Sequence, residues 1–508
     1  MNNLLSMVNF KELLQPQLDE FITSQVHACG EIFLVGGAIR NTFLRKDVKD
    51  LDFVVKKGAI TAARNVADRF NGDFYILDKK RGAARALISI RGKKLIIDFT
   101  LLNGRSIDDD LNKRDFTINA MAIKVPLSSK VIDPLNGEGD IKGSILRSCS
   151  PNSFQDDPVR TLRAIRFMSE FNLFLDQSEV ELIKSASRNL DEISNERKRD
   201  EIINVLEKTD GKKALTQMLE FGIIEKVFPE VKKLYKMELD TPHVHDAWTH
   251  TLQVVSYCQQ LMAISKNYPD SKRLHPRIRQ AINLLSKYRK HIINYMNDPI
   301  SMNRSMYSLL ILACIYHDAG KGVVPPIIRD NRKSFPKHAR IGSELMHNRA
   351  RVMGFSNSEV DYLTKIVRFH MKPSQSEFSN NTKKDIHIHR FYKKTGIAGI
   401  MVGFVHLSDV LATYEDTLTE ERWNRAISSV NNIFNAYFIH HAKIITPPKL
   451  IDGNDILKEF NLQPGKKIGG LLERVAEAQV NGEVHTKGEA IDYLRQQLMV
   501  EKNNQENL

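Results

Sequence analysis

The chain has 508 residues, of which 42% are hydrophobic and 27% charged, a composition typical of a globular protein and not of a disordered or membrane-spanning one. Its length exceeds what a single core organises, so about three or four domains are expected. The formal net charge of +13 favours a polyanionic partner such as nucleic acid, although many basic proteins bind none.

The amino-terminal segment and the cysteines indicate the compartment. Lys11 and Glu12 interrupt the first apolar residues, which argues against a secretory signal, and no apolar run reaches membrane-spanning length. The cysteines form no C-x-x-C pair, which argues against a zinc knuckle or a disulfide framework and predicts buried thiols. We expect a cytoplasmic protein without a membrane partner, and the sequence leaves its oligomeric state open. The four cysteines are Cys29, Cys149, Cys258 and Cys314.

Residues 31–55 predict a strand, a tight Gly-Gly turn, a helix and a second strand that carries a D-x-D motif. Side chains alternate along a strand, so both aspartates project from one face. Two carboxylates on one face repel unless a cation lies between them, and Mg²⁺ prefers carboxylate and phosphate oxygens. The stretch therefore predicts a site for metal and nucleoside triphosphate, although each motif alone is also typical of a plain turn or a solvated strand edge. The residues are Gly36, Gly37, Arg40, Asp50 and Asp52.

Further strands are expected at residues 73–77, 85–90 and 94–100, and the turn at 91–93 joins the last two as a hairpin. Asp98 lies in the last of these strands. It is expected either to lie beside the aspartate pair or to hold a neighbouring loop.

The segment that follows contains Arg114, which suits a phosphate or a base, and Asp115, which suits a ribose hydroxyl. An acidic first helical turn is the alternative interpretation. The turn-rich residues 133–147 close this domain near residue 148.

Residues 149–238 show helical patterns without strand signals. One helix presents an acid and a basic stripe at intervals of three residues. The stripe is typical of a solvated face, but it also suits a carboxylate and a guanidinium that together meet the hydrogen-bonding edge of a base. Its members are Asp157, Arg160, Arg163 and Arg166.

These motifs together resemble those of class II tRNA nucleotidyltransferases and bacterial poly(A) polymerases, over residues 31–230. The Glu196-Arg197 segment completes the series. The resemblance implies magnesium on one pair of residues, triphosphate contacts from the glycine turn and two arginines, and base recognition by the helical stripe. The implied assignments are magnesium on Asp50 and Asp52, triphosphate on Gly37, Arg40 and Arg114, and the base on Asp157 and Arg160 with Arg163 and Arg166 completing the pocket.

The chain departs from the family pattern in several places. Asn41 follows Arg40 where the family has aspartate, and Lys113 replaces an arginine. The short connection from Asp98 to Lys113 leaves little room for the flexible loop of CCA-adding members. Its absence resembles members that add only two cytidines, so the nucleotide specificity stays open.

Downstream helical segments carry histidines and aspartates in an order that resembles the HD phosphohydrolase superfamily. A single helical histidine is usually structural, but a His-Asp pair at the end of an apolar helix brings two metal ligands to one place. The resemblance implies a divalent metal of unknown identity whose bound hydroxide attacks a phosphoester. The implied ligands are His250, His317, Asp318 and Asp409, with His338 and His370 for a second metal and Lys321 for phosphate.

Several remaining features lie outside the two sets of motifs. The basic residues 274–291 indicate an inserted helix that either contacts RNA or forms a solvated face. Lys466 and Lys467 begin a late helix and are expected to meet an RNA phosphate. The histidines that fit no ligand pattern are His387, His389, His440 and His441.

The predicted fold class is α+β, with four domains. They are a small mixed-sheet nucleotidyltransferase head (1–148), an all-α neck (149–238), an all-α HD domain (239–418) and a helical C-terminal tRNA-binding region (419–508).

The predicted function is addition of CMP from CTP to the 3′ end of tRNA, with AMP from ATP completing CCA left open, beside phosphohydrolysis at the HD site. The alternatives are a poly(A) polymerase, an HD phosphohydrolase whose head only binds RNA, and a non-catalytic RNA-binding protein. The intact Asp50 and Asp52 argue against the HD phosphohydrolase whose head only binds RNA. The non-catalytic RNA-binding protein is disfavoured because both metal constellations are complete.

Overall fold

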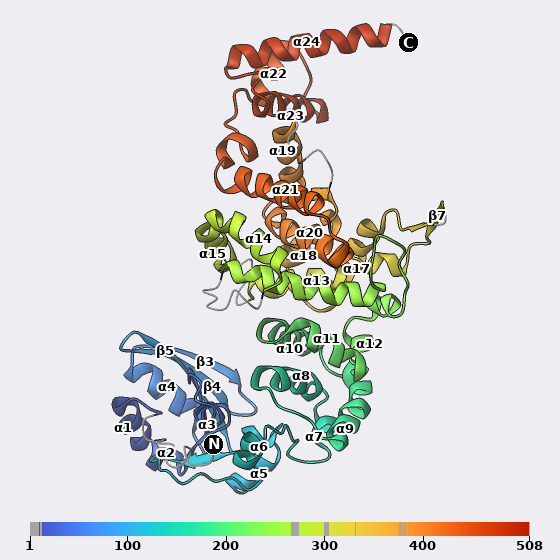
Figure 1. The fold of residues 1–508 in the computed structure, drawn as a ribbon. Coiled ribbons are helices and arrows are strands. Elements are labelled where there is room, and N and C mark those ends of the chain that lie inside the picture. The colour runs from blue at the N-terminus through green and yellow to red at the C-terminus, as the bar shows by residue number, and fades with distance from the viewer. Residues whose placement is uncertain are drawn as a thin grey trace. The chain divides into compact units, whose positions relative to one another are not determined.

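The computed structural model describes residue 10 and residues 13–265, 274–298, 304–330, 332–374, 378 and 383–506. The chain divides into two compact units (Figure 1). The first consists of Met1–Glu201 with Gln217–Lys226, and the second of Ile202–Thr216 with Val227–Leu508.

A six-stranded mixed sheet organises the first unit, and helices form the rest of it. In chain order the elements are α1 (Pro16–Ser24), α2 (Val26–Cys29), β1 (Ile32–Val35), α3 (Gly37–Phe43), β2 (Asp50–Val55), α4 (Ala59–Arg69), β3 (Asp73–Asp78), β4 (Ala83–Ile90), β5 (Lys93–Leu101), α5 (Ile107–Asn112), β6 (Ala122–Lys124), α6 (Gly137–Gly143), α7 (Ser153–Asp156), α8 (Arg160–Phe171), α9 (Gln177–Ser187), α10 (Asn195–Lys208), α11 (Gly211–Glu220) and α12 (Ile224–Val227), the helices α10 and α11 crossing between the units.

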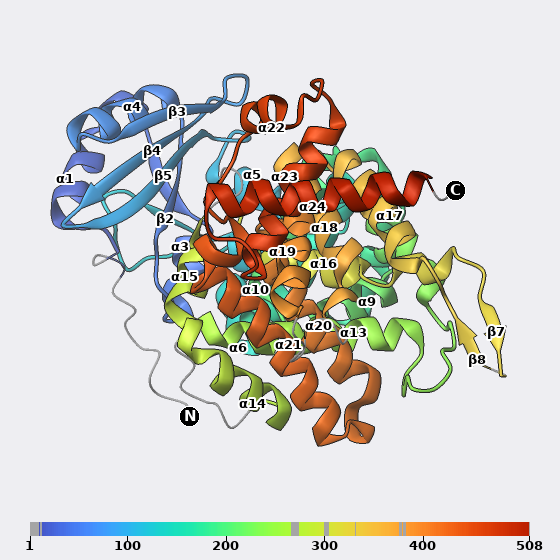
Figure 2. The same cartoon turned by 90° about the horizontal axis from the view of Figure 1, so that it is seen from above.

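The strand order in the sheet is β3-β4-β5-β2-β1-β6, and its first four strands are seen side by side in Figure 2. Strand β2 pairs parallel with β5 and antiparallel with β1. The predicted hairpin is confirmed, because β4 and β5 pair antiparallel around Arg91 (φ 51°) and Gly92 (φ 76°).

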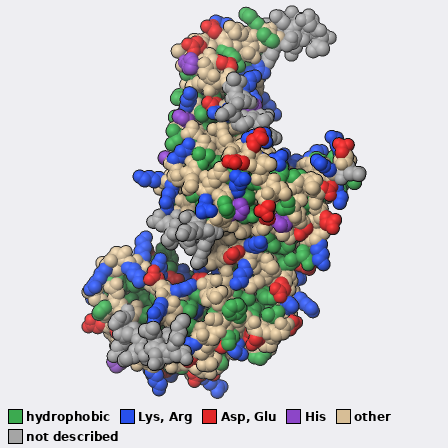
Figure 3. All heavy atoms as spheres, in the orientation of Figure 1, with side chains coloured by type: hydrophobic (Ala, Val, Ile, Leu, Met, Phe, Trp, Pro, Cys, Tyr) green, Lys and Arg blue, Asp and Glu red, His purple; other side chains and the backbone are tan. Residues whose placement is uncertain are grey.

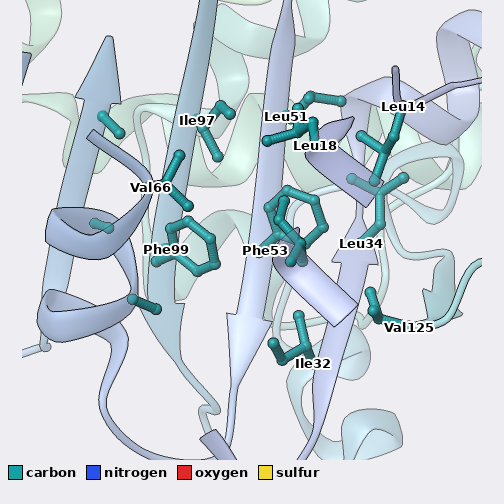
Figure 4. Close-up of a cluster of buried hydrophobic side chains, with 14 of the residues drawn as sticks. Leu14, Leu18, Ile32, Leu34, Leu51, Phe53, Val66, Ile97, Phe99 and Val125 are labelled. Atoms are coloured by element: carbon teal, nitrogen blue, oxygen red, sulfur yellow. The ribbon is translucent and has the colours of Figure 1, made fainter. Parts of the chain in front are cut away.

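Alternation along β2 separates an apolar face from an acidic one. Leu51 and Phe53 are both 1% exposed and belong to the larger core, where α1 and α4 cover the sheet (Figure 4). Phe53 stacks on Phe99 of β5 at 5.2 Å between ring centroids. The aspartates of β2 therefore lie on the opposite face, as the alternation predicts.

Helices build almost all of the second unit. In chain order its later elements are α13 (Ala247–Leu261), α14 (Pro276–Leu285), α15 (Arg289–Asn297), α16 (Met306–Tyr316), β7 (Ile327–Arg329), β8 (Arg332–Ser334), α17 (His338–Val352), α18 (Asn357–Phe369), α19 (Lys384–Thr395), α20 (Ala398–Tyr414), α21 (Glu420–Phe438), a π-helix (His441–Ile445), α22 (Gly453–Phe460), α23 (Lys466–Val480) and α24 (Lys487–Glu506).

The fold class is confirmed, with one addition. An antiparallel hairpin of β7 and β8 interrupts the helical region that was expected to be all-α. It follows Pro325 and Pro326, which lack the amide hydrogen that a helix needs. The division into four domains stays a prediction.

The second unit is centred on α16, which is apolar on all sides and is buried accordingly. Across the described residues, no single helix is long and apolar enough to cross a membrane, and only the bent pair Lys384–Thr395 and Ala398–Thr417 passes that test jointly. The four cysteines are free and buried, as predicted.

Candidate functional sites

Three carboxylates lie on the acidic face of the sheet in the first unit. Asp50 and Asp52 lie on β2, and Asp98 on β5 is the register partner of Asp52. Asp98 accepts two hydrogen bonds from Arg85 of β4, each 2.8 Å long. Asp98 therefore does lie beside the aspartate pair.

The negatively charged carboxylates repel one another. Burial, followed by the charge of Asp98, raises the pKa of Asp52 to about 6, and Asp50 adds to the effect while Arg114 opposes it. A divalent cation with a preference for oxygen ligands would relieve this repulsion. The donor set of Asp50 and Asp52, with Asp98 alongside, thus fits a divalent metal.

The Gly-Gly turn lets an arginine come close. Gly36 has φ 73°, and a Cβ placed on it would lie 3.1 Å from Nη1 of Arg114. Arg114 itself donates two hydrogen bonds of 3.1 Å to Asp110 Oδ1. A side chain at position 36 would therefore force the Arg114 guanidinium, a predicted triphosphate contact, to shift by a few tenths of an ångström.

Arg40 is placed differently from the other predicted triphosphate ligands. It is 9% exposed, donates to Asn119 and Asn41, and its guanidinium lies 4.3 Å from the ring centroid of Phe171. Burial lowers its pKa to about 10. In this structure Arg40 holds α3 against α8.

Asp115 is saturated by protein donors. Its Oδ1 accepts from the Phe116 amide (2.8 Å) and Asn119 (3.0 Å), and its Oδ2 accepts from Nε (2.8 Å) and Nη2 (2.6 Å) of Arg163. Burial opposes its ionisation, but Arg163, Asn119 and the amide outweigh burial and lower the pKa of Asp115 to about 2. The carboxylate joins the segment after α5 to helix α8.

The predicted base-reading pair is engaged with other protein groups. Arg160 donates to Ser153 Oγ (2.6 Å) and to the carbonyls of Arg114 (3.1 Å) and Lys113 (2.9 Å). Asp157 Oδ2 accepts from Arg197 at 2.7 Å. Its Oδ1 is buried without a hydrogen-bond partner in the described part of the chain.

The other two arginines of the stripe converge on an acid that the sequence did not single out. Glu201 lies 2.5 Å from Nε of Arg166 and 3.7 Å from Nη1 of Arg163. Glu201 lies four residues after Arg197 on α10, so helical spacing from the recognised segment was the available signal.

The connection after β5 is short and tied down. Residues 102–106 separate β5 from α5, and the amide of Asn103 donates to Asp110 Oδ2 at 3.0 Å. Lys113 Nζ donates to the carbonyl of Asn103 at 2.9 Å. The segment thus has little freedom to act as a long loop.

Six predicted metal ligands converge in the second unit around the buried Asp318. Its Oδ2 lies 3.4 Å from Nε2 of His317 and 3.7 Å from Nε2 of His250, and its Oδ1 lies 3.3 Å from Nε2 of His338 and 3.9 Å from Nε2 of His370. Asp409 on α20 completes the set, with Oδ1 3.1 Å from Nε2 of His250. Five of the six form two groups of three that share Asp318, each with ligand atoms within 4.8 Å of one another, and Asp409 belongs to neither group. The groups are His250, His317 and Asp318, and Asp318, His338 and His370.

Backbone carbonyls set the tautomer of three of these histidines. Each Nδ1 donates to the carbonyl three residues earlier, which leaves Nε2 as the lone-pair donor in the neutral ring. All three Nε2 atoms face Asp318, which is the arrangement a transition metal requires. The bonds join His317 to Cys314 (2.7 Å), His338 to Phe335 (2.8 Å) and His370 to Val367 (2.7 Å).

Charges in this cluster favour ionised carboxylates. Burial opposes ionisation of Asp318, but Lys321 and His317 outweigh it and hold the pKa of Asp318 well below its usual range. Burial lowers the pKa of His370 to about 3, so this ring is neutral and able to bind metal. The donor set fits one or two divalent transition metals.

A cavity of about 600 Å³ opens beside the cluster and is lined in part by Asp318, Lys321 and Asp409. His243 also lines it, and its Nε2 lies 3.3 Å from Nζ of Lys321. Sequence reasoning missed His243, because it precedes α13 and shares no helical spacing with His250.

The basic segments that were predicted to contact RNA form helices in the structure. Residues 276–291 form α14, a 3-10 turn and the start of α15 instead of one inserted helix, and α14 buries Ile278 and Leu285. Lys466 and Lys467 begin α23. Figure 3 shows Lys and Arg side chains spread over the visible face of both units. Contact of any of these with RNA stays a prediction.

Four family models match the sequence along nearly its whole length. They are described as the poly A polymerase head domain (32–147), the probable RNA and SrmB-binding site of polymerase A (172–234), the HD domain (248–414) and tRNA nucleotidyltransferase domain 2, putative (377–494).

Curated relatives match over similar lengths. A CC-adding tRNA nucleotidyltransferase of Geobacter sulfurreducens is 26% identical over 464 residues, which is 91% of each chain. An A-adding tRNA nucleotidyltransferase of Deinococcus radiodurans is 25% identical over 90% of this chain and 93% of its own.

The fold is similar to that of a CCA-adding enzyme of Thermotoga maritima solved in complex with tRNA. The TM-score is 0.55 at 19% identity, and the match covers 96% of this chain and 97% of the other. At this identity the likeness is one of fold.

Proposed function

We propose that this chain, which belongs to the family of class II tRNA nucleotidyltransferases and bacterial poly(A) polymerases, adds CMP from CTP to the 3′ end of tRNA. The observation that carries the proposal is the set of three carboxylates, Asp50, Asp52 and Asp98, on one face of the sheet. The CC-adding relative aligned over 91% of the chain supports tRNA as the acceptor. An RNA-binding head alone would not need the repulsion that raises the pKa of Asp52 to about 6.

The reaction joins the tRNA terminal hydroxyl to the α-phosphate of CTP. The hydroxyl oxygen loses its proton to solvent and forms the new bond to the α-phosphorus. The bond between the α-phosphorus and the oxygen that bridges to the β-phosphate breaks, and pyrophosphate leaves with that electron pair. Asp50 and Asp52 would hold Mg²⁺, which when bound stabilises charge on the attacking and leaving oxygens. Arg114 beside Gly36 would neutralise the triphosphate.

Base selection is assigned to Asp157 and Arg160. A carboxylate accepts from the 4-amino group of cytosine, and the partnerless Asp157 Oδ1 is available for that bond. Arg160 would donate to the same base after it leaves the carbonyls of Lys113 and Arg114. The short, tied connection at residues 102–106 supports CMP addition without AMP addition.

The test uses tRNAs that end before the first C, after one C and after two, each with CTP or ATP alone. The expected products gain two and one nucleotides with CTP, and the third tRNA gains none with ATP. Asp50→Ala is expected to abolish extension, whereas Asp108→Ala, which removes an exposed acid of the same domain, keeps it. Extension by Asp50→Ala, or repeated ATP incorporation as in a poly(A) polymerase, would contradict the proposal.

A second activity is proposed for the second unit, namely metal-dependent phosphohydrolysis. It rests on the convergence of His250, His317, His338 and His370 on Asp318. A divalent metal there would lower the pKa of a bound water toward neutrality. Lys321, with Nζ 2.6 Å from Asp318 Oδ2, would bind the phosphate.

Hydrolysis of bis(4-nitrophenyl) phosphate, measured with Mg²⁺, Mn²⁺ or Ni²⁺, tests this activity. His317→Ala is expected to abolish it and to leave CMP addition intact. His347→Ala, which removes an exposed histidine of α17, serves as the matched control. Hydrolysis that persists in His317→Ala would place the activity elsewhere.

A further inference from the structure

A cavity of about 570 Å³ in the second unit belongs to neither metal site. We call it the C-terminal cavity; its walls come from α19, the end of α21, the π-helix, residues 446–451 and α23. Helices α19 and α23 lie side by side in Figure 1, and Arg390 of α19 forms a bidentate ion pair with Glu477 of α23. Its volume lies in the range of small-molecule sites, roughly 300–1,000 Å³.

The backbone around the π-helix leaves a carbonyl that a side chain must satisfy. A continuing α-helix would bond the carbonyl of Ile444 to the amide of residue 448, but that residue is Pro448 and has no amide hydrogen. His389 Nδ1 donates to this carbonyl instead, at 2.7 Å. π-helical turns occur frequently at functional sites.

This bond determines what His389 offers to the cavity. With Nδ1 as the donor, Nε2 of the neutral ring is an acceptor. His389 is 7% exposed and lines the cavity, and its hydrogen bond to the Ile444 carbonyl uses Nδ1 and leaves Nε2 for a ligand. Nε2 therefore presents an acceptor to the cavity, where a donor on a ligand can reach it.

The other walls suit a flat ring that is joined to a negatively charged group. Tyr437 and His441 meet edge to face at 5.2 Å between ring centroids, and Pro447 adds a rigid ring to the lining. Lys449 lines the cavity, is exposed, and has no ion-pair partner in the part of the chain that the structure describes. Lys393 pairs with Glu473 at 2.6 Å at another side of the lining.

We propose that the C-terminal cavity binds the base of an amino-substituted nucleotide such as AMP or CMP. His389 Nε2 accepts from the exocyclic amine, the base packs against Tyr437 and His441, and Lys449 neutralises the phosphate. The nucleotide is either free or an unstacked nucleotide of RNA. The proposal goes beyond the two metal sites and does not depend on catalysis at either.

Two neighbouring glycines provide matched variants. A Cβ placed on Gly469 or on Gly470 meets no described atom within 4 Å, so either accepts a side chain. Gly469 lines the cavity and Gly470 does not. Gly469→Leu therefore fills the cavity, and Gly470→Leu adds the same side chain one residue later in the same helix.

The experiment labels the full-length protein by photolysis with 8-azido-AMP in EDTA, and separately with tRNA that contains 8-azidoadenosine. Labelled peptides are mapped by mass spectrometry. We expect label within residues 389–393 or 437–451 in the wild type and in Gly470→Leu. In Gly469→Leu the amount of label in these segments should be at least about tenfold lower than in the wild type, as expected for loss of one base–aromatic stack.

Competition identifies the recognised group. AMP should displace the label at concentrations about tenfold lower than purine riboside monophosphate, which lacks the amine. If only 8-azido-AMP labels these segments, the ligand is a free nucleotide, and if only the tRNA probe labels them, the ligand is RNA. The proposal is overturned if neither probe labels these segments, if Gly469→Leu is labelled like the wild type, or if both competitors act equally. CMP addition, assayed in parallel, reports separately on the head.

Discussion

Asp115→Asn distinguishes a carboxylate that joins two parts of the fold from one that binds substrate. All of its hydrogen bonds come from protein donors, two of them from Arg163. Its pKa falls from an ordinary value of 3.8 to about 2 although burial opposes this. That difference corresponds to roughly 2 kcal/mol in favour of the ionised form in the folded protein.

The sign of the pH dependence follows from the lowered pKa. The stabilisation is complete above the unfolded value of 3.8 and is lost as the pH falls through about 2. Asp115→Asn removes it at every pH and also leaves Arg163 without its bidentate partner. We therefore expect the first unit to open more readily in the variant at pH 7, by a factor of about 30 for a loss of roughly 2 kcal/mol.

Hydrogen exchange resolved by peptide is the suitable assay. Trp248 and Trp423 both lie in the second unit, so their fluorescence does not report on the first. Peptides spanning α5 to α8 should lose protection in Asp115→Asn but not in Asp108→Asn, which removes an exposed charge nearby. If protection changes by less than about threefold while CMP addition falls more than tenfold, Asp115 acts on the substrate and the reasoning is refuted.

Three further outcomes are expected. Because burial and Asp98 raise the pKa of Asp52 to about 6, the metal-free wild type should lose stability as the pH rises from about 4 through 6. Asp52→Asn should remove this loss and be more stable than the wild type by up to about 3 kcal/mol at pH 7 without metal. With saturating Mg²⁺, thermal unfolding should instead show the wild type to be the more stable of the two. His317→Ala should lower the bound transition metal, measured by mass spectrometry of the purified protein, by at least about tenfold. Gly36→Ala should destabilise the first unit by about 1–2 kcal/mol, measured by hydrogen exchange, and should reduce CMP addition, measured by primer extension. Gly58 also has a positive φ of 70°, but no described atom lies within 4 Å of an added Cβ, so Gly58→Ala should reduce stability and leave CMP addition unchanged.

Local periodicity was sufficient for the strands and for the face on which the aspartates lie. Leu51 and Phe53 had to point away from Asp50 and Asp52, because alternation is a property of any extended chain. The turn at Arg91-Gly92 was predictable from Gly92, which adopts a positive φ without a Cβ clash, whereas the positive φ of Arg91 was not.

The sequence also determined which residue types were available for metal. Histidines and aspartates in the order of a known family predicted the cluster around Asp318, and the structure brings them together. The sequence contained no sign of the carbonyl bonds that orient the rings, because those depend on where each helix ends.

Only the tertiary structure decided which polar groups meet. Arg40 pairs with Asn119, 79 residues later, and Arg163 with Asp115, 48 residues earlier, so their partners depend on which donors and acceptors folding buries together. A buried guanidinium takes the nearest acceptor because it is shielded from water. Composition and spacing therefore determined the chemistry that this chain can perform, and the long-range packing decided which of its charged side chains remain free to perform it.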